Sequence, residues 1–97
     1  MRLRISREAA EDLEFIWTYS REKWSVEQAN RYYHFIFEEI DLICRNPLAG
    51  LDYSHIRLGY RKVSVKSQSI FYRIVAADNS LEIIRILHQK MDVDLNL

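Results

Sequence analysis

The spacing of apolar residues changes once along this chain, at Asn46-Pro47, and that change constrains the fold more than any other feature. Before it, apolar residues recur every three or four positions, as on one face of an amphipathic helix. After it, they alternate or run together over short stretches, as in β-strands. A chain of 97 residues is the size of one domain. We therefore expect residues 1–97 to form a single α+β domain.

The first half predicts a short strand and then two helices. Residues 2–6 alternate in polarity, as strands do. Ser6 is placed to cap a first helix of about four turns, and Ser25 begins the capping-box pattern of a second. Residues 21–25 are the expected connection, and Pro47 ends the second helix because the residue before a proline avoids helical geometry. Two such helices are expected to pack as an antiparallel hairpin.

The second half predicts three strands joined by short turns. Residues 58–66, 70–76 and 81–88 are rich in Val, Ile, Tyr and Phe, with turns at 67–69 and 77–80. Connections this short require antiparallel pairing. The last two strands are apolar on both faces, so they are expected to be central, although the pattern does not decide which face meets the helices. The expected order is β-α-α-β-β-β, a helical hairpin packed on a small antiparallel sheet.

Charge is balanced over the whole chain but not along it. Fourteen Lys and Arg residues match fourteen acids, which argues against binding nucleic acid through bulk charge. Residues 1–54 hold seven basic side chains against ten acids, whereas residues 55–90 hold seven against two. The second half therefore presents either a cationic surface for an acidic partner or an ordinary solvated sheet face.

Several classes of protein are excluded or disfavoured by composition. The single cysteine, Cys44, cannot form an internal disulfide and is expected in the core, and no spacing of His and Cys suits a metal. No Gly-rich phosphate loop or other cofactor motif is present. Neither a signal peptide nor a membrane-spanning run is recognisable. We therefore expect a soluble cytoplasmic domain with no metal, cofactor or membrane partner.

Aromatic residues are more numerous in the first half than one helical stripe needs. Phe15, Tyr19 and Phe35 lie off the main apolar stripes. The favoured interpretation is a broad core that buries them. The alternative is a second apolar surface that binds a partner.

Charged residues inside apolar strands form the one constellation with possible chemistry. Arg73 and Arg85 must each reach water, a carboxylate or a phosphate, because an unpaired buried guanidinium is very unfavourable. With Arg61, Lys62 and His88 they could form an anion-binding face, or they could pair with acids of the helices. Since Arg85 is nearer a strand end, we expect it to face a partner, and mid-strand Arg73 to be structural.

A set of short motifs, in order from about residue 3 to residue 94, resembles the ParE toxins of the RelE/ParE superfamily. No single motif is specific, but the set is. It comprises Glu11-Asp12-Leu13 with Ile16-Trp17, Ala29-Asn30-Arg31-Tyr32, Asn46-Pro47, Ile56-Arg57-Leu58-Gly59-Tyr60-Arg61, Ile70-Phe71-Tyr72-Arg73, and Arg85-Ile86-Leu87-His88 through Met91-Asp92. The fold of that superfamily, a helical hairpin on an antiparallel sheet, agrees with the periodicity.

The resemblance implies a toxin that poisons DNA gyrase, as in plasmid-stabilising toxin–antitoxin systems. It also implies a cognate ParD-like antitoxin that wraps the toxin in a hetero-oligomer, so that operator DNA is reached only through the antitoxin. The residues expected to contact antitoxin or target are Trp17, Arg57, Arg61, Arg73, Arg85 and His88.

The alternative implied by the superfamily is a ribosome-dependent mRNA endonuclease, for which the candidate catalytic residues are Arg73, Arg85 and His88. Such cleavage needs both a base and an acid within hydrogen-bond reach of the reacting oxygens. His88 alone supplies one of them, and no convincing tyrosine follows the last strand. The non-enzymatic interpretation is therefore favoured, with no catalytic residue assigned.

Overall fold

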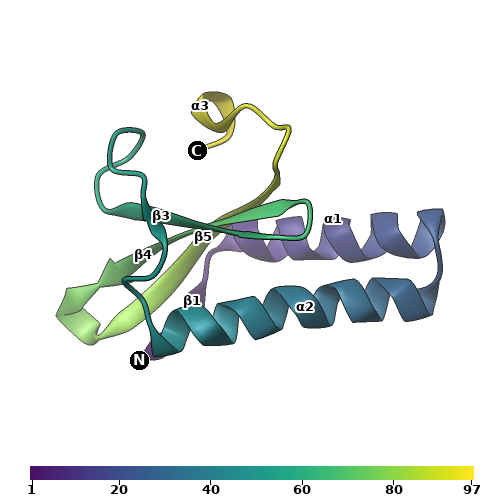
Figure 1. The fold of residues 1–97 in the computed structure, drawn as a ribbon, viewed down its shortest axis with the longest axis horizontal. Helices are drawn as coiled ribbons and strands as arrows, with labels where there is room; N and C mark the ends of the chain where they lie inside the picture. Colours follow the sequence, from purple (N-terminus) through teal and green to yellow (C-terminus); the bar gives the residue numbers. More distant parts are fainter.

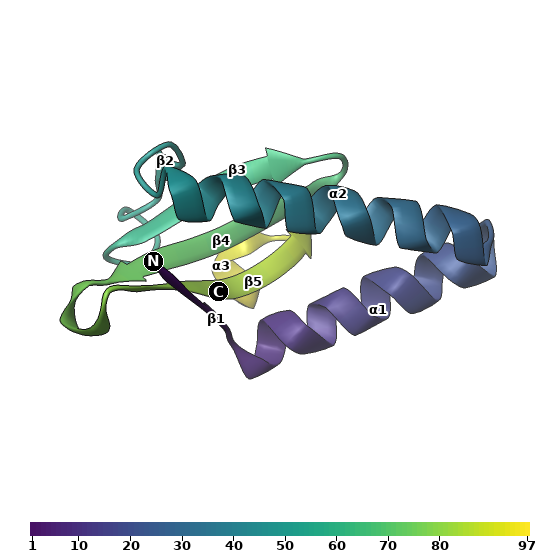
Figure 2. The ribbon, with the colours of Figure 1, turned by 90° about the horizontal axis from the view of Figure 1, so that it is seen from below.

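A computed structural model describes residues 1–97 as a helical hairpin packed on one face of a five-stranded sheet (Figures 1 and 2). The strand order across the sheet is β1-β5-β4-β3-β2. The predicted α+β class, hairpin and central last two strands are confirmed. The elements are β1 (Arg2–Ile5), α1 (Arg7–Lys23), α2 (Val26–Arg45), β2 (Leu51–Asp52), β3 (Tyr60–Val65), β4 (Gln68–Val75), a 3-10 turn (Ala76–Asp78), β5 (Ser80–His88) and α3 (Val93–Asn96).

Both helices begin at the predicted serine caps. The Ser6 hydroxyl accepts from the Ala9 N–H at 3.0 Å, and the Ser25 hydroxyl accepts from the Gln28 N–H at 3.1 Å. Each cap satisfies an amide that the first helical turn leaves without a partner. The connection is shorter than the predicted residues 21–25, because α1 continues to Lys23 and its last turn places basic side chains at the negative end of the helix dipole.

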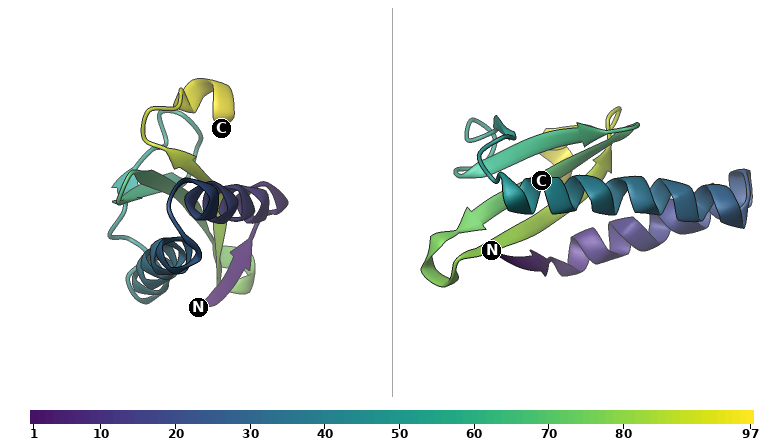
Figure 3. Two further views of the ribbon diagram at one scale, coloured as in Figure 1. Left: turned by 90° about the vertical axis from the view of Figure 1, so that its right-hand side faces the viewer. Right: turned by 60° about the horizontal axis from the view of Figure 1, so that its bottom comes forward.

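The sheet differs from the prediction in three places. The β3–β4 turn consists of Lys66 and Ser67, not residues 67–69, because Lys66 adopts a positive φ of 55° that closes a two-residue hairpin. β2 and α3 were not predicted, since two and four residues are too short to show periodicity. Finally, β1 pairs in parallel with β5, which makes the sheet mixed (Figure 3).

The core lies between the hairpin and the sheet. A β-bulge decides which strand residues face it: Phe71 pairs with Arg85, whereas the next residue, Tyr72, pairs with Ile83, so that Ile84 is the extra residue. The bulge allows both Ile83 and Ile86 to enter the core despite their opposite parity. The eleven clustered core residues are Ala9, Leu13, Ile16, Ile36, Ile40, Ile43, Ile70, Tyr72, Leu81, Ile83 and Ile86.

The positive φ of Lys66 gives a prediction about stability. Replacing Lys66 by Gly is expected to give a protein about 1 kcal/mol more stable than replacing it by Ala, because only Ala carries a Cβ into the left-handed region. Both variants lose the contact between the Lys66 ammonium and the Phe35 ring, at 4.1 Å, so comparing them isolates the backbone effect. Urea unfolding measures the difference, and equal stabilities would show that the turn relaxes to accept Ala.

Candidate functional site

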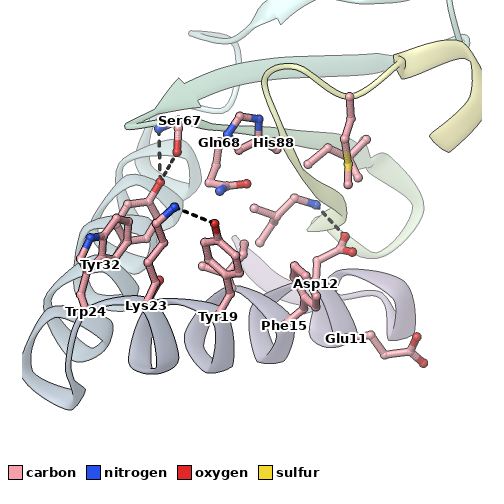
Figure 4. A pocket seen from close by; sticks show the side chains of 15 residues that line it. Glu11, Asp12, Phe15, Tyr19, Lys23, Trp24, Tyr32, Ser67, Gln68 and His88 are labelled. Carbon is pink, nitrogen blue, oxygen red and sulfur yellow. Dashed lines mark hydrogen bonds between the residues drawn. The ribbon is translucent and has the colours of Figure 1, made fainter.

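An apolar groove of ≈ 750 Å³ lies between α1 and the ends of β4 and β5 (Figure 4). It forms because the hairpin extends past the sheet, so that the later turns of α1 are not covered by strands (Figure 1). Eight of its fifteen lining residues are hydrophobic. The floor is buried Ile86 and Leu87, and the side toward the C-terminus carries Met91.

Aromatic side chains of α1 form one wall of the groove. Phe15 and Tyr19 are four residues apart, so they share a helix face, and their rings stack with centroids 6.2 Å apart. Phe15, Tyr19 and Trp24 are 67%, 48% and 57% exposed. The favoured expectation of broad burial is thus wrong for Phe15 and Tyr19, which form a second apolar surface. Phe35 is partly buried beneath Lys66.

Polar groups at the far end of the groove hold the β3–β4 turn against the hairpin. The Tyr32 hydroxyl accepts from the Ser67 N–H at 3.2 Å and lies 2.7 Å from the Ser67 hydroxyl. On the opposite wall, the Lys23 ammonium donates to the Tyr19 hydroxyl at 3.1 Å. Figure 4 shows these groups on both sides of the opening. The groove is therefore basic at this end and acidic at the other, where Glu11 lines it.

Arg85 is bonded within the protein, and the expectation that it is the more exposed of the two arginines is wrong. Its Nε and Nη2 donate to the two carboxylate oxygens of Asp12 at 2.8 and 2.9 Å, and its Nη1 donates to the Asn96 carbonyl at 2.8 Å. The Asp12 carboxylate also accepts from the Ile86 N–H at 2.9 Å. The hydrogen bonds to Asp12 raise the pKa of the Arg85 guanidinium, so it stays charged. This cluster fastens α1 and α3 to β5.

Arg73 is the more exposed of the two arginines, which reverses the order of exposure that strand position predicted. Its Nε donates to Glu82 across the sheet at 2.9 Å, and its side chain is 47% exposed, against 24% for Arg85. The bulge explains the error. The bulge shifts the β4–β5 register by one residue between the pair that contains Arg73 and the pair that contains Arg85. Position along a strand therefore could not predict which of the two arginines is more buried.

The other sequence-predicted site residues do not converge on one place. His88 lines the groove. Trp17 donates from Nε1 to Asn30 at 2.9 Å, and Arg57 is exposed on the loop before β3. Arg61 donates to the carbonyls of Leu48 and Gly50 at 3.2 and 2.8 Å, so it holds the chain after α2.

No cluster of three or more His, Cys, Asp and Glu side chains is arranged to hold a metal ion. Neither long helix has an apolar stretch sufficient to cross a bilayer. Burial raises the pKa of the Cys44 thiol, with the Asp41 carboxylate adding to the shift, so this cysteine is a protonated, partly buried side chain at neutral pH.

Comparisons with known proteins agree on one family. Residues 3–93 match the family model described as the ParE toxin of the type II toxin–antitoxin system parDE. Toxin ParE1 of Mycobacterium tuberculosis is 41% identical over 93 residues, covering 96% of this chain and 94% of that protein. Toxin ParE1 of Caulobacter vibrioides is 40% identical over 94 residues, covering 97% and 95%. A chain of the chromosomal ParDE system from P. aeruginosa shares the fold, with a TM-score of 0.78 at 22% identity over 91% of this chain and 95% of that one.

Proposed function

This chain belongs to the ParE toxin family of type II toxin–antitoxin systems, and from that membership we propose that it acts in the cytoplasm by inhibiting DNA gyrase. The proposal is a non-enzymatic one, in which the toxin binds gyrase and stalls it on cleaved DNA. The observation that carries it is the match over nearly the whole chain to ParE toxins. A cognate antitoxin neutralises the toxin, and the toxin acts once the antitoxin is lost.

The contacts of the three residues that the alternative hypothesis, a ribosome-dependent nuclease, would use for catalysis support the non-enzymatic proposal. Arg85 is occupied by Asp12 and the Asn96 carbonyl, and Arg73 donates to Glu82. The Nδ1 of His88 accepts from the Lys90 N–H at 3.1 Å. None of the three is paired with another in the manner of a base and its acid.

Gyrase inhibition is tested with purified toxin in two parallel assays. We expect the protein to inhibit supercoiling of relaxed plasmid and to increase cleaved DNA, while ribosome-bound messenger RNA stays intact. The same protein mixed with excess antitoxin is the control and should leave gyrase active. Codon-dependent cleavage of message with gyrase unaffected would overturn the proposal in favour of a ribosome-dependent nuclease.

The groove is the surface that we propose for the antitoxin. Apolar patches of this kind on small domains mark protein interaction sites, and here the patch is a concave one lined by Phe15, Tyr19 and Trp24. The antitoxin, itself the DNA-binding member of a hetero-oligomer, would supply apolar side chains to the groove and acidic ones to the basic end near Lys23. Operator DNA is then reached only through the antitoxin.

This division of contacts predicts a modest salt dependence. Raising salt from ~50 to ~200 mM should weaken the complex only a few-fold, because burial of apolar surface is not screened. Phe15→Ala should weaken binding at every salt concentration without lowering Tm, since Phe15 is 67% exposed. Leu95→Ala, at an 83% exposed residue outside the groove, is the matched control. Loss of binding at ~200 mM salt would show that charge alone holds the complex.

A further inference from the structure

The face of the sheet that points away from the helical hairpin carries a row of charged side chains. Ile70 and Tyr72 of β4 belong to the core, so the alternate residue Arg73 lies on the other face. Residues paired in register on neighbouring strands share a face, so the row continues across the sheet. From β1 to β3 it consists of Arg4, Glu82, Arg73 and Tyr60.

Three more cations extend this row into a strip. Arg2 lies two residues before the arginine of the row in β1, so it shares the face. Lys62 pairs with Phe71, again on the side away from the core. Arg57 lies on the loop after β2, which folds over the same side of the sheet (Figure 1) and packs Tyr53 against Phe71, with ring centroids 5.5 Å apart. We define the cationic strip as Arg2, Arg4, Arg57, Lys62 and Arg73.

Three cations of the strip share two carboxylates. The Asp78 carboxylate lies 3.8 Å from the guanidinium of Arg2 and 3.3 Å from that of Arg4, so one acid serves both arginines of β1. Glu82 pairs with Arg73 at 2.9 Å. One positive charge of these three is therefore not neutralised.

The contacts of the other two cations do not reduce their charge. Arg57 donates to the Ile56 carbonyl at 2.8 Å, and the Lys62 ammonium lies 5.4 Å from the centre of the Tyr53 ring. Five cations against two carboxylates leave a local charge of +3 on the strip. The two long helices on the opposite side carry nine acids against five Lys and Arg residues. The charge balance of the whole chain thus hides a cationic side and an acidic side.

We propose that the cationic strip binds the phosphate backbone of double-stranded DNA. The inference rests on the proposed function, since the DNA in question is the segment on which gyrase is stalled. The strip crosses four strands, about 14 Å, and a duplex carries about eight phosphates over that length. Guanidinium groups match phosphate oxygens in geometry and keep their charge at any physiological pH. Contacts to the backbone alone read no sequence, so recognition of the operator stays with the antitoxin.

DNA suits the strip better than an acidic protein does. Protein interfaces have a buried apolar centre that supplies most of their affinity. Phe71, the large apolar residue beneath the strip, is fully buried, and Leu58 is the exposed apolar side chain beside Arg57. A surface of charges with so little apolar area can bind a phosphate backbone, because that binding comes from the release of counterions.

The test measures binding of purified toxin to a fluorescently labelled duplex of about 30 bp by anisotropy, with no gyrase present. We expect a Kd between about 1 and 100 μM near 0.1 M salt, as for sequence-independent binding. The logarithm of the association constant should fall by about three for a tenfold rise in salt, because about three phosphates are neutralised. Failure to bind the duplex at about 50 mM salt would overturn the inference.

The double variant Arg57→Gln with Lys62→Gln removes the two cations that no carboxylate neutralises. We expect it to bind the duplex at least tenfold more weakly at low salt and to reduce the salt slope by about two. The control, Arg31→Gln with Arg45→Gln, removes two exposed cations from α2 and should change neither value more than slightly. Equal losses in both double variants would show that net charge, and not the strip, determines binding.

Two single variants make the test independent of folding. Arg57→Gln, at an exposed loop residue, should leave Tm unchanged and reduce the slope by about one. Asp94→Asn should bind DNA more tightly, because α3 places this acid on the same side of the sheet as the strip (Figure 1). If Arg57→Gln keeps the slope of the wild type, the strip is not the binding surface.

A second probe decides between DNA and an acidic protein. Poly-glutamate with the same number of charges as one strand of the duplex should bind more weakly than the duplex. If it binds more tightly, the strip is a site for an acidic protein segment and the inference is overturned.

The outcomes also separate this inference from the proposed function. A toxin that inhibits gyrase but does not bind the duplex would leave the proposed function standing and overturn the role of the strip. A toxin that binds the duplex through the strip but leaves gyrase active would contradict the proposed function and keep the DNA-binding surface.

Discussion

Arg85→Ala is expected to lower the free energy of unfolding by about 3 kcal/mol, near the lower end for breaking a buried ion pair because both side chains keep some exposure. The change removes the two bonds to Asp12 and the bond to the Asn96 carbonyl, and it leaves the Asp12 carboxylate without its counter-charge. A loss of this size is a large part of the ~5–15 kcal/mol that stabilises a small domain. Urea unfolding followed by circular dichroism measures it.

Arg73→Ala is the matched control, because it removes the same side chain from the neighbouring strand. The Arg73 side chain is 47% exposed and makes one hydrogen bond to Glu82, whose carboxylate is 16% exposed. We therefore expect its loss to lower stability by about 1 kcal/mol, less than the loss of Arg85. Asp12→Asn should fall between the two, because the amide oxygen can still accept from the Ile86 N–H. If Arg73→Ala is the more destabilising variant, the roles assigned here to the two arginines are wrong.

Gly50→Ala is the second change with a large expected effect, because a methyl group there would collide with the ring of buried Tyr72. An added Cβ would lie 2.8 Å from Cε1 of that ring, closer than real carbon contacts allow. The Gly50 N–H donates to the Tyr72 hydroxyl at 3.0 Å, and that hydroxyl donates to the Pro47 carbonyl at 2.7 Å. We expect a loss of about 3 kcal/mol, combining overpacking with disturbed hydrogen bonds. Thermal unfolding is the measurement.

The control for Gly50→Ala is the double variant with Tyr72→Phe. Tyr72→Phe alone removes both hydrogen bonds and is expected to cost about 1–2 kcal/mol. In the double variant the hydroxyl oxygen, which is the atom nearest the added Cβ, is absent and its hydrogen bonds are already lost, although the contact with the ring carbons remains. The combined loss should therefore be smaller than the sum of the two single losses. Additive losses would place the strain elsewhere, for example in the backbone after α2.

The helices and strands were predictable because their signals are local. Ser6 and Ser25 cap the helices through residues three positions away, and Pro47 acts on the residue beside it. The strand segments show their apolar character within each run. Such signals need no knowledge of which parts of the chain meet.

The bulge and the partner of Arg85 were not predictable, because both depend on which distant parts of the chain meet. An extra residue in β5 leaves no mark in the sequence of that strand, yet it changes which side chains face the core. Asp12 is 73 residues from Arg85 and is one acid among fourteen, so nothing in the sequence pairs it with Arg85. The position of an isolated arginine in a strand therefore does not reveal whether it binds a partner or the protein itself.

The groove was half predictable. Phe15 and Tyr19 could be seen to lie off the apolar stripe at helical spacing, which is the pattern of a second surface. Their exposure depends on how far the hairpin extends beyond the sheet, a property of tertiary structure. Gln68 was not recognised as a residue of the groove, because it was expected in a turn and lies instead at the start of β4.

The parallel pairing of β1 with β5 has a consequence for how the toxin is made. Arg2 pairs with Ser80 and Ile5 with Ile83, so the edge strand cannot join the sheet until the last strand exists. At ~5–20 residues per second, the roughly 75 residues between them take the ribosome about 4–15 s. During that time the hairpin can form locally, but the groove cannot, since its floor belongs to β5. A nascent chain therefore does not present the groove until translation is nearly complete, so the antitoxin binding that we propose for this surface would be a post-translational event.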